Sequence, residues 1–179
     1  LAEIENCKNG LPSGIWLKCN SLVDHRLIGL LYEASQAGVP IEIMARGICC
    51  LRPGVAGLSE TITVRSIIGR FLEHGRIYVF ANGGEFLSDK NIVMISSADL
   101  MPRNLRRRVE CFMRLENPTI RKQVLHQIMA ALLRDEKNVW YLQPDGSYVH
   151  PQTDETSFSC HEYFMSNPSL SGLGSLAAT

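Results

Sequence analysis

The fold of this chain is decided by residues 64–80, VRSIIGRFLEHGRIYVF. The apolar run at its end predicts a buried strand. Immediately before that strand, His74 lies between Arg70 and Arg76. Side chains at the mouth of a strand tend to project into clefts, and cationic groups beside an imidazole suit the binding and protonation of phosphate. The segment therefore predicts a phosphate-binding site at one end of a sheet.

Upstream, the sequence predicts a strand, a helix and a second strand. Residues 15–19 and 39–45 are mostly apolar runs of strand length, and Asp24 is placed to cap a helix that Gly38 ends. Short links of this kind join neighbouring parallel strands by a right-handed crossover. We therefore expect a parallel pair near the centre of the sheet.

Downstream, the pattern predicts four more strands, over residues 62–65, 76–80, 92–96 and 107–113. A short irregular helix is expected over 68–74, and the Pro- and Gly-containing segment 47–60 is expected to be a functional loop. Pro118 opens a helix with an apolar side and a polar side that includes Gln127. The sum is a sheet of about six strands in an α/β domain.

The two ends of the chain differ from its middle. Residues 1–9 resemble the end of a helix cut from an upstream domain, and residues 10–150 carry the α/β pattern. Within residues 10–150, the segment 139–149 predicts a hairpin around a Pro-Asp-Gly turn. Residues 151–179 are rich in Ser, Thr and Gly and are expected to be a flexible tail, so His161 receives no role.

Composition limits the classes of function. The chain has 179 residues, a formal net charge of +0 and 45% hydrophobic residues. These values fit one globular domain that has no net positive charge to attract nucleic acid. The six cysteines lack zinc-binding spacing, and Cys19 and Cys111 lie in strand-like runs, so we expect reduced, buried thiols. No signal peptide or membrane-spanning run is seen, which predicts a cytoplasmic location.

Three segments carry a resemblance to a known family: residues 44–54, 64–80 and 95–104, within a similar region from about residue 10 to residue 148. Together they closely resemble the C-terminal catalytic domain of bacterial polyphosphate kinase. The resemblance implies a phospholipase D-like α/β fold, with a mixed central sheet and helices on both faces. It also implies an enzyme with two such halves, each of which supplies a histidine.

His74 and Arg46 are the leading candidate site residues. From its position alone, His74 is either a core histidine or a phosphate-facing acid or base. By resemblance it is the partner histidine of this half, and the phosphorylated nucleophile lies in the other half. Arg46 follows an apolar strand, where α/β sheets place ligands, and it matches the family's arginine for nucleotide phosphate. Its guanidinium fork suits two-point contact with phosphoryl oxygens.

The phospholipase D pattern is His-x-Lys, then Asp, then Gly-Ser-x-Asn. This chain has His74-Gly75-Arg76, no acid at Ala81, and Ser96-Ser97-Ala98-Asp99. These departures favour a supporting role for His74 over a nucleophilic one.

Further arginines are candidates for lining a polyphosphate channel, or else belong to a solvated edge. Arg106 and Arg108 would share one face of the predicted strand, and Arg52 lies in the long loop. The full set of these candidates is Arg52, Arg76, Arg103, Arg106 and Arg108.

The resemblance implies reversible transfer of the terminal phosphate of ATP to polyphosphate through a phosphohistidine, with ATP or ADP as substrate. The resemblance places Mg²⁺ in the upstream half of the same chain, with no metal site in this fragment. It also implies a homo-oligomeric enzyme. The expected location is the cytoplasm, and a peripheral position at the membrane is the alternative. The fragment alone is expected to be inactive. Two other hypotheses stay open: a phospholipase D-like phosphodiesterase, and a non-catalytic domain that completes an oligomer. Nucleic acid is not expected as a partner.

Overall fold

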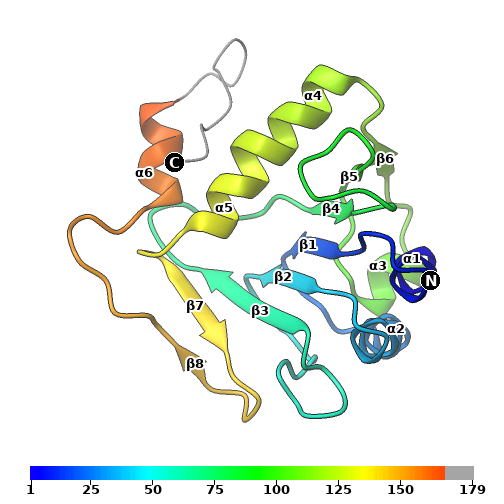
Figure 1. Ribbon diagram of the computed structural model, residues 1–179. Helices are drawn as coiled ribbons and strands as arrows, with labels where there is room; N and C mark the ends of the chain where they lie inside the picture. Colours follow the sequence, from blue (N-terminus) through cyan, green and yellow to red (C-terminus); the bar gives the residue numbers. More distant parts are fainter. Residues whose placement is uncertain (168–179) are drawn as a thin grey trace.

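The computed structural model describes residues 1–167, which form one eight-stranded mixed sheet with the strand order β6-β5-β4-β1-β2-β3-β7-β8 (Figure 1). The predicted hairpin is confirmed as β7 and β8, and it joins the sheet through an antiparallel pairing of β7 with β3. This pairing explains why the sheet is larger than the expected six strands. The strands are β1 (Ile15–Cys19), β2 (Ile41–Ala45), β3 (Ile62–Ile67), β4 (Ile77–Phe80), β5 (Ile92–Ser96), β6 (Phe112–Arg114), β7 (Val139–Leu142) and β8 (Tyr148–Val149).

The predicted crossover unit is confirmed. Strands β1 and β2 are parallel and are joined by helix α2 (His25–Gln36). The Asp24 carboxylate accepts hydrogen bonds from the backbone amides of Arg26 and Leu27 at 3.1 and 3.0 Å, which satisfies two amides of the first turn. Gly38, with a φ of +93°, lets the chain leave the helix through the left-handed region.

Helices cover both faces of the sheet, as expected (Figure 1). On one face, α1 (Ala2–Lys8), α2 and α3 (Pro102–Arg106) lie over a core that includes Leu17, Ile43 and Leu31. On the other face lies a continuous helical segment made of α4 (Pro118–Lys122), the π-helical turns η1 (Gln123–Met129) and α5 (Ala130–Arg134). This second core includes Leu125 and Leu132.

Several local predictions are wrong. Residues 68–74 form no helix but an irregular loop, which packs closely at Gly69: a Cβ there would lie 2.6 Å from the side chains of Asn138 and His161. The predicted strand over 107–113 does not form over most of its length, because α3 ends at Arg106 and the short edge strand β6 begins only at Phe112, so Arg106 lies on a helix. Cys111 is exposed, and Gln127 is buried.

Part of the expected tail is also ordered. Helix α6 (Cys160–Ser166) lies beside α5, and its Cys160 and His161 are buried (Figure 1). The prediction of a flexible tail therefore does not hold for this helix. Of the predicted tail over 151–179, residues 168–179 lie outside the described residues.

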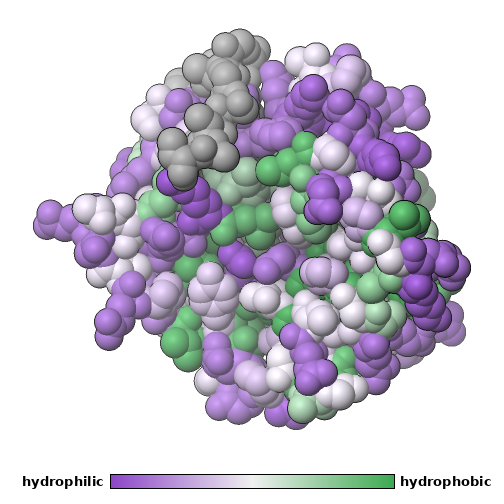
Figure 2. All heavy atoms as spheres, in the orientation of Figure 1, coloured by the Kyte–Doolittle hydropathy of each residue, from purple (hydrophilic) through white to green (hydrophobic). Residues whose placement is uncertain are grey.

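The face shown in Figure 2 is mostly hydrophilic, and its hydrophobic residues form separate small areas. Across the described residues, no helix has both the length and the apolar character needed to cross a membrane.

Candidate functional site

The sheet topology brings four chain segments to one edge. Strands β1 and β2 are parallel, so Asn20 and Arg46, which follow them directly, lie at the same edge. Strand β4 is antiparallel to β1 and therefore begins at this edge, with His74 and Arg76 just before it. Strand β5 is antiparallel to β4 and ends there, close to Asp99. Residues far apart in sequence thus meet at the ends of these four strands.

His74 is exposed, which excludes the core-histidine alternative. The Arg76 guanidinium lies against it: Nη1 and Nη2 are each 3.3 Å from a ring nitrogen, and Nη1 also donates to the His74 carbonyl oxygen at 3.0 Å. The arginine therefore fixes both the backbone and the ring of His74.

Asp99 anchors this arrangement. One oxygen accepts from Arg76 Nη2 at 2.7 Å, and the other accepts from the backbone amides of Asn20 and Ser21 at 2.8 and 3.1 Å. Burial raises the pKa of Asp99, but the hydrogen bonds from Arg76 and the two amides outweigh it and hold the pKa below its ordinary value. Asp99 is therefore ionised at neutral pH and keeps Arg76 in place.

Arg46 joins the same network through Asn20, whose side-chain oxygen accepts a hydrogen bond from Arg46 Nη2. Within residues 1–167, the buried Nε atoms of Arg46 and Arg76 have no hydrogen-bond partner. A buried N–H donor normally requires an acceptor. Two guanidinium groups with unused donors thus lie in the same network as His74, and an anion with several oxygens is the complementary ligand.

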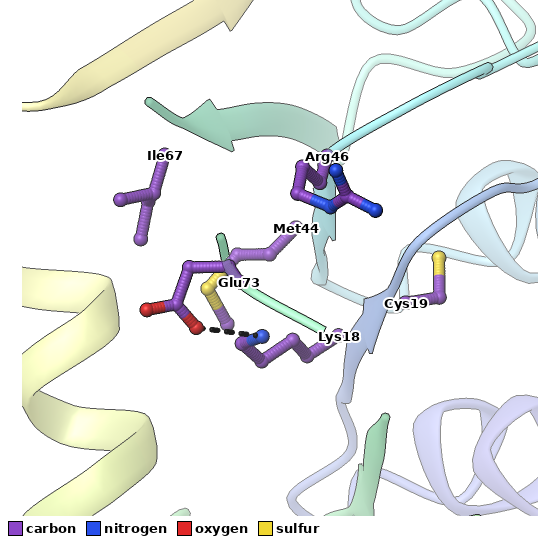
Figure 3. A pocket seen from close by; sticks show the side chains of 6 residues that line it. All are labelled: Lys18, Cys19, Met44, Arg46, Ile67 and Glu73. Atoms are coloured by element: carbon purple, nitrogen blue, oxygen red, sulfur yellow. Dashed lines mark ion pairs between the residues drawn. The ribbon is translucent and has the colours of Figure 1, made fainter. Parts of the chain in front are cut away.

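A small pocket opens beside this network (Figure 3). Lys18 and Glu73 point toward one another across it and form an ion pair of 3.0 Å. Burial raises the pKa of the Cys19 thiol to about 12, so this sulfur is not a nucleophile at neutral pH. The pocket is lined by Lys18, Cys19, Met44, Arg46, Ile67 and Glu73.

The other candidate arginines are not gathered in this network. Arg52 donates from Nε to the Pro144 carbonyl oxygen at 2.9 Å, which ties the 47–60 loop to the β7–β8 turn. Arg106 pairs with Asp24 at 2.6 Å and so links α3 to the cap of α2.

Arg103 and Arg108 are exposed on the α3 side of the site. Hydrogen bonds from Ser97 and Asn104, with smaller contributions from the charges of Arg108 and Arg76, lower the pKa of Glu110.

The residues present do not fit a magnesium ion. Two carboxylates of this region are already paired, Asp99 with Arg76 and Glu73 with Lys18 and His161. Magnesium requires oxygen ligands in octahedral geometry, and a cationic surrounding opposes it. Among residues 1–167, no group of three or more His, Cys, Asp or Glu side chains is arranged to hold a metal.

Sequence reasoning missed several members of the site. Lys18 interrupts an apolar strand, and a charged residue at a buried strand position signals that a partner must exist. The composition around His161 predicts a tail, although Ser159 and Glu162 have the spacing of a capping box that opens a helix. In the structure Ser159 caps α6 by accepting from the Glu162 amide at 3.3 Å. Asn20 gave no recognisable signal.

Comparison with solved structures supports the fold. A crystal structure of polyphosphate kinase from Porphyromonas gingivalis superposes with a TM-score of 0.85 at 35% sequence identity, covering 93% of this chain and 25% of that one. The predicted α/β fold, phospholipase D-like with a mixed sheet and helices on both faces, is confirmed.

Sequence relatives point the same way. A polyphosphate kinase from Erythrobacter litoralis is 56% identical over 96% of this chain, and one from Synechocystis is 51% identical over 90%. These matches cover 24% and 22% of the relatives, so the chain spans about a quarter of their length. The family model described as polyphosphate kinase C-terminal domain 2 matches residues 1–160. On these grounds the chain belongs to the polyphosphate kinase C-terminal domain family.

Proposed function

We propose that this chain supplies one half of the active site of a polyphosphate kinase that reversibly transfers the terminal phosphoryl group of ATP to polyphosphate. The observation that carries the proposal is the connection of Arg46 to His74 through Asn20, Asp99 and Arg76 at one sheet edge. A binding site for a phosphate chain needs fixed cationic donors, and two guanidinium groups in this network have unused buried donors.

In this proposal the phosphoryl group moves in two steps. The bond between its phosphorus and the bridging oxygen of ATP breaks as a bond forms to a histidine nitrogen in the upstream half, and ADP leaves. The phosphorus–nitrogen bond then breaks as the terminal oxygen of polyphosphate attacks. Arg46 binds phosphoryl oxygens of the nucleotide, and His74 assists transfer by a hydrogen bond or proton to a phosphoryl oxygen.

The residues of this chain therefore act by orientation and charge neutralisation. Phosphoryl transfer places negative charge on oxygens around the phosphorus, and preorganised cationic donors stabilise that charge more in the transition state than in the substrate. Arg76 is held by Asp99 before substrate binds, so it needs no reorganisation. No step is assigned to magnesium on this half.

The proposal also includes partners. ATP, ADP and polyphosphate are the substrates, and the upstream phospholipase D-like half of the same polypeptide supplies the nucleophile. In the same proposal, the full-length enzyme is a homo-oligomer and lies in the cytoplasm. The 179-residue chain by itself is expected to have no kinase activity, because the nucleophilic histidine lies elsewhere.

The test uses a full-length kinase that carries this chain as its C-terminal part. We expect Arg46→Ala to lower kcat/KM for ATP by about 100-fold or more, the scale seen on removal of one preorganised donor, and Arg46→Lys to retain an intermediate activity because an ammonium cannot form the two-point contact. His74→Ala should lower kcat to a similar extent. Arg26→Ala, at an exposed position on α2, is the matched control.

Melting temperatures of all four proteins show whether the fold is intact. Wild-type kcat and kcat/KM in folded Arg46→Ala and His74→Ala proteins would contradict the proposal and favour the alternative of a non-catalytic domain.

A further inference from the structure

The loop that carries His74 rests on a buried histidine from a distant part of the chain. His161, on α6, is 1% exposed. Its Nδ1 accepts from the Phe71 backbone amide at 3.4 Å, and its Nε2 lies 3.0 Å from a Glu73 carboxylate oxygen. A backbone amide can only donate, so Nδ1 is the acceptor, and the ring proton of a neutral His161 resides on Nε2 and is donated to Glu73. His161 thus contacts the loop at two points.

Glu73 extends the connection to the centre of the sheet. Its second carboxylate oxygen forms the ion pair with Lys18 Nζ at 3.0 Å (Figure 3). Lys18 also donates to the Gly75 carbonyl oxygen at 3.2 Å. Both sequence neighbours of His74 are therefore held by one lysine, which is buried on β1. A buried ammonium needs such partners, because unpaired it would carry a large desolvation cost.

Packing reinforces the same contact. The Phe71 ring meets the His161 ring edge-on, with 5.3 Å between ring centroids. The loop also approaches α6 so closely at Gly69 that an added Cβ would lie 2.6 Å from His161 Nδ1. At its ends the loop is fixed by backbone hydrogen bonds from the Ile68 amide to Asn138 and from the Ser96 amide to Arg76. Between those ends, α6 and β1 set its course.

We propose that His161, Glu73 and Lys18 form a positioning relay that fixes the loop and so determines where His74 presents its imidazole. Helix α6 is then part of the support of the active site, although it lies far from His74 in sequence. None of the three residues is assigned contact with substrate. Loss of the relay should affect turnover only if His74 has its proposed role. Its effect on the position of the loop does not depend on that role.

The relay predicts a specific pattern of kinetic change. Arg46 is held by a different contact, to Asn20, so nucleotide binding should survive loss of the relay. In the full-length kinase we expect Glu73→Ala and His161→Ala to lower kcat by about 10- to 100-fold, as small misplacements of catalytic groups do, with KM for ATP within about twofold of wild type. His161→Gln keeps a side-chain donor toward Glu73 and should recover part of kcat.

A second measurement follows the loop itself. Hydrogen–deuterium exchange of the same full-length proteins should show faster exchange in peptides covering residues 68–76, by about tenfold, with the exchange of β1 and β2 unchanged. Glu162→Gln is the matched control, because Glu162 is on the same helix and pairs with Lys137 at 3.1 Å in an exposed position. If His161→Ala does not fold, Glu73→Gln serves instead, since one amide cannot accept from both Lys18 and His161.

The two hypotheses fail in different ways. Unchanged exchange over residues 68–76 in folded variants would overturn the relay. If His74→Ala itself retains wild-type kcat, the proposed function fails, and the exchange measurement alone decides about the relay. A rise in KM with kcat unchanged would overturn the relay as a positioning device for transfer.

Discussion

The Asp99–Arg76 ion pair offers a quantitative test of how the site is built. Asp99→Asn keeps the shape of the side chain and one carbonyl oxygen, but removes the charge that faces Arg76. Both side chains are nearly buried, with 6% and 11% exposed. Loss of one partner from a buried pair leaves an uncompensated charge, which costs about 3–5 kcal/mol. Because Asn can still accept from the backbone amides, we expect about 2–4 kcal/mol of lost stability.

The assay is urea unfolding of the 179-residue chain at pH 7. Asp89→Asn is the matched control, because Asp89 is 71% exposed and lies 3.5 Å from Arg121. Exposed ion pairs contribute about 0–1 kcal/mol, so this variant should unfold almost as wild type does. A loss below about 1 kcal/mol in Asp99→Asn would refute the reasoning that the pair is a buried anchor.

The same variant makes a prediction about pH. The pKa of Asp99 is lower in the folded chain than its ordinary value of 3.8. A lowered pKa means that the folded state binds fewer protons, so the stabilisation is present above the unfolded pKa and is lost as pH falls through the folded one. Wild type should therefore lose more stability than Asp99→Asn between about pH 5 and pH 2. Parallel pH profiles for the two proteins would be incompatible with this assignment.

Two further predictions concern the scaffold. Asp24→Ala removes the cap of α2 and leaves Arg106 unpaired. The free energy of unfolding should therefore fall by about 1–3 kcal/mol in urea titrations. An unchanged urea midpoint would show that the cap is dispensable. Leu125→Ala, at a residue 1% exposed, should cost about 2–5 kcal/mol, while Ile120→Ala, at a residue 47% exposed, should cost less than about 1 kcal/mol; equal losses would contradict the assigned core face.

The features that sequence predicted well are those set by local chemistry. The apolar runs that became β1 and β2, and the Asp24 cap between them, depend on neighbouring residues and were confirmed. Pro118 opens the predicted helix, where Asn117 caps the first turn. Periodicity over a few residues is sufficient for such elements.

The features that sequence missed depend on contacts between distant segments. The pairing of β7 with β3 depends on residues about 70 positions apart, and the burial of His161 depends on Glu73, 88 positions away. A strand would put Arg106 and Arg108 on one face, yet a helix places Arg106 beside Asp24, 82 positions away. In the site, the sequence named Arg46, His74 and Arg76 as candidates, but it gave no role to Asn20, which contacts Arg46, or to His161, which contacts the loop before His74.

The two outer strands of the sheet bear on how the chain behaves in solution. Strand β6 at one edge has three residues, all exposed, and β8 at the other has two. An open edge offers unpaired amide and carbonyl groups on which another chain can add a strand, and short edges with charged side chains limit such addition. Strand β6 carries the charged Arg114, and both edge strands offer few free backbone groups. The sheet is therefore a poor template for the addition of strands from other chains.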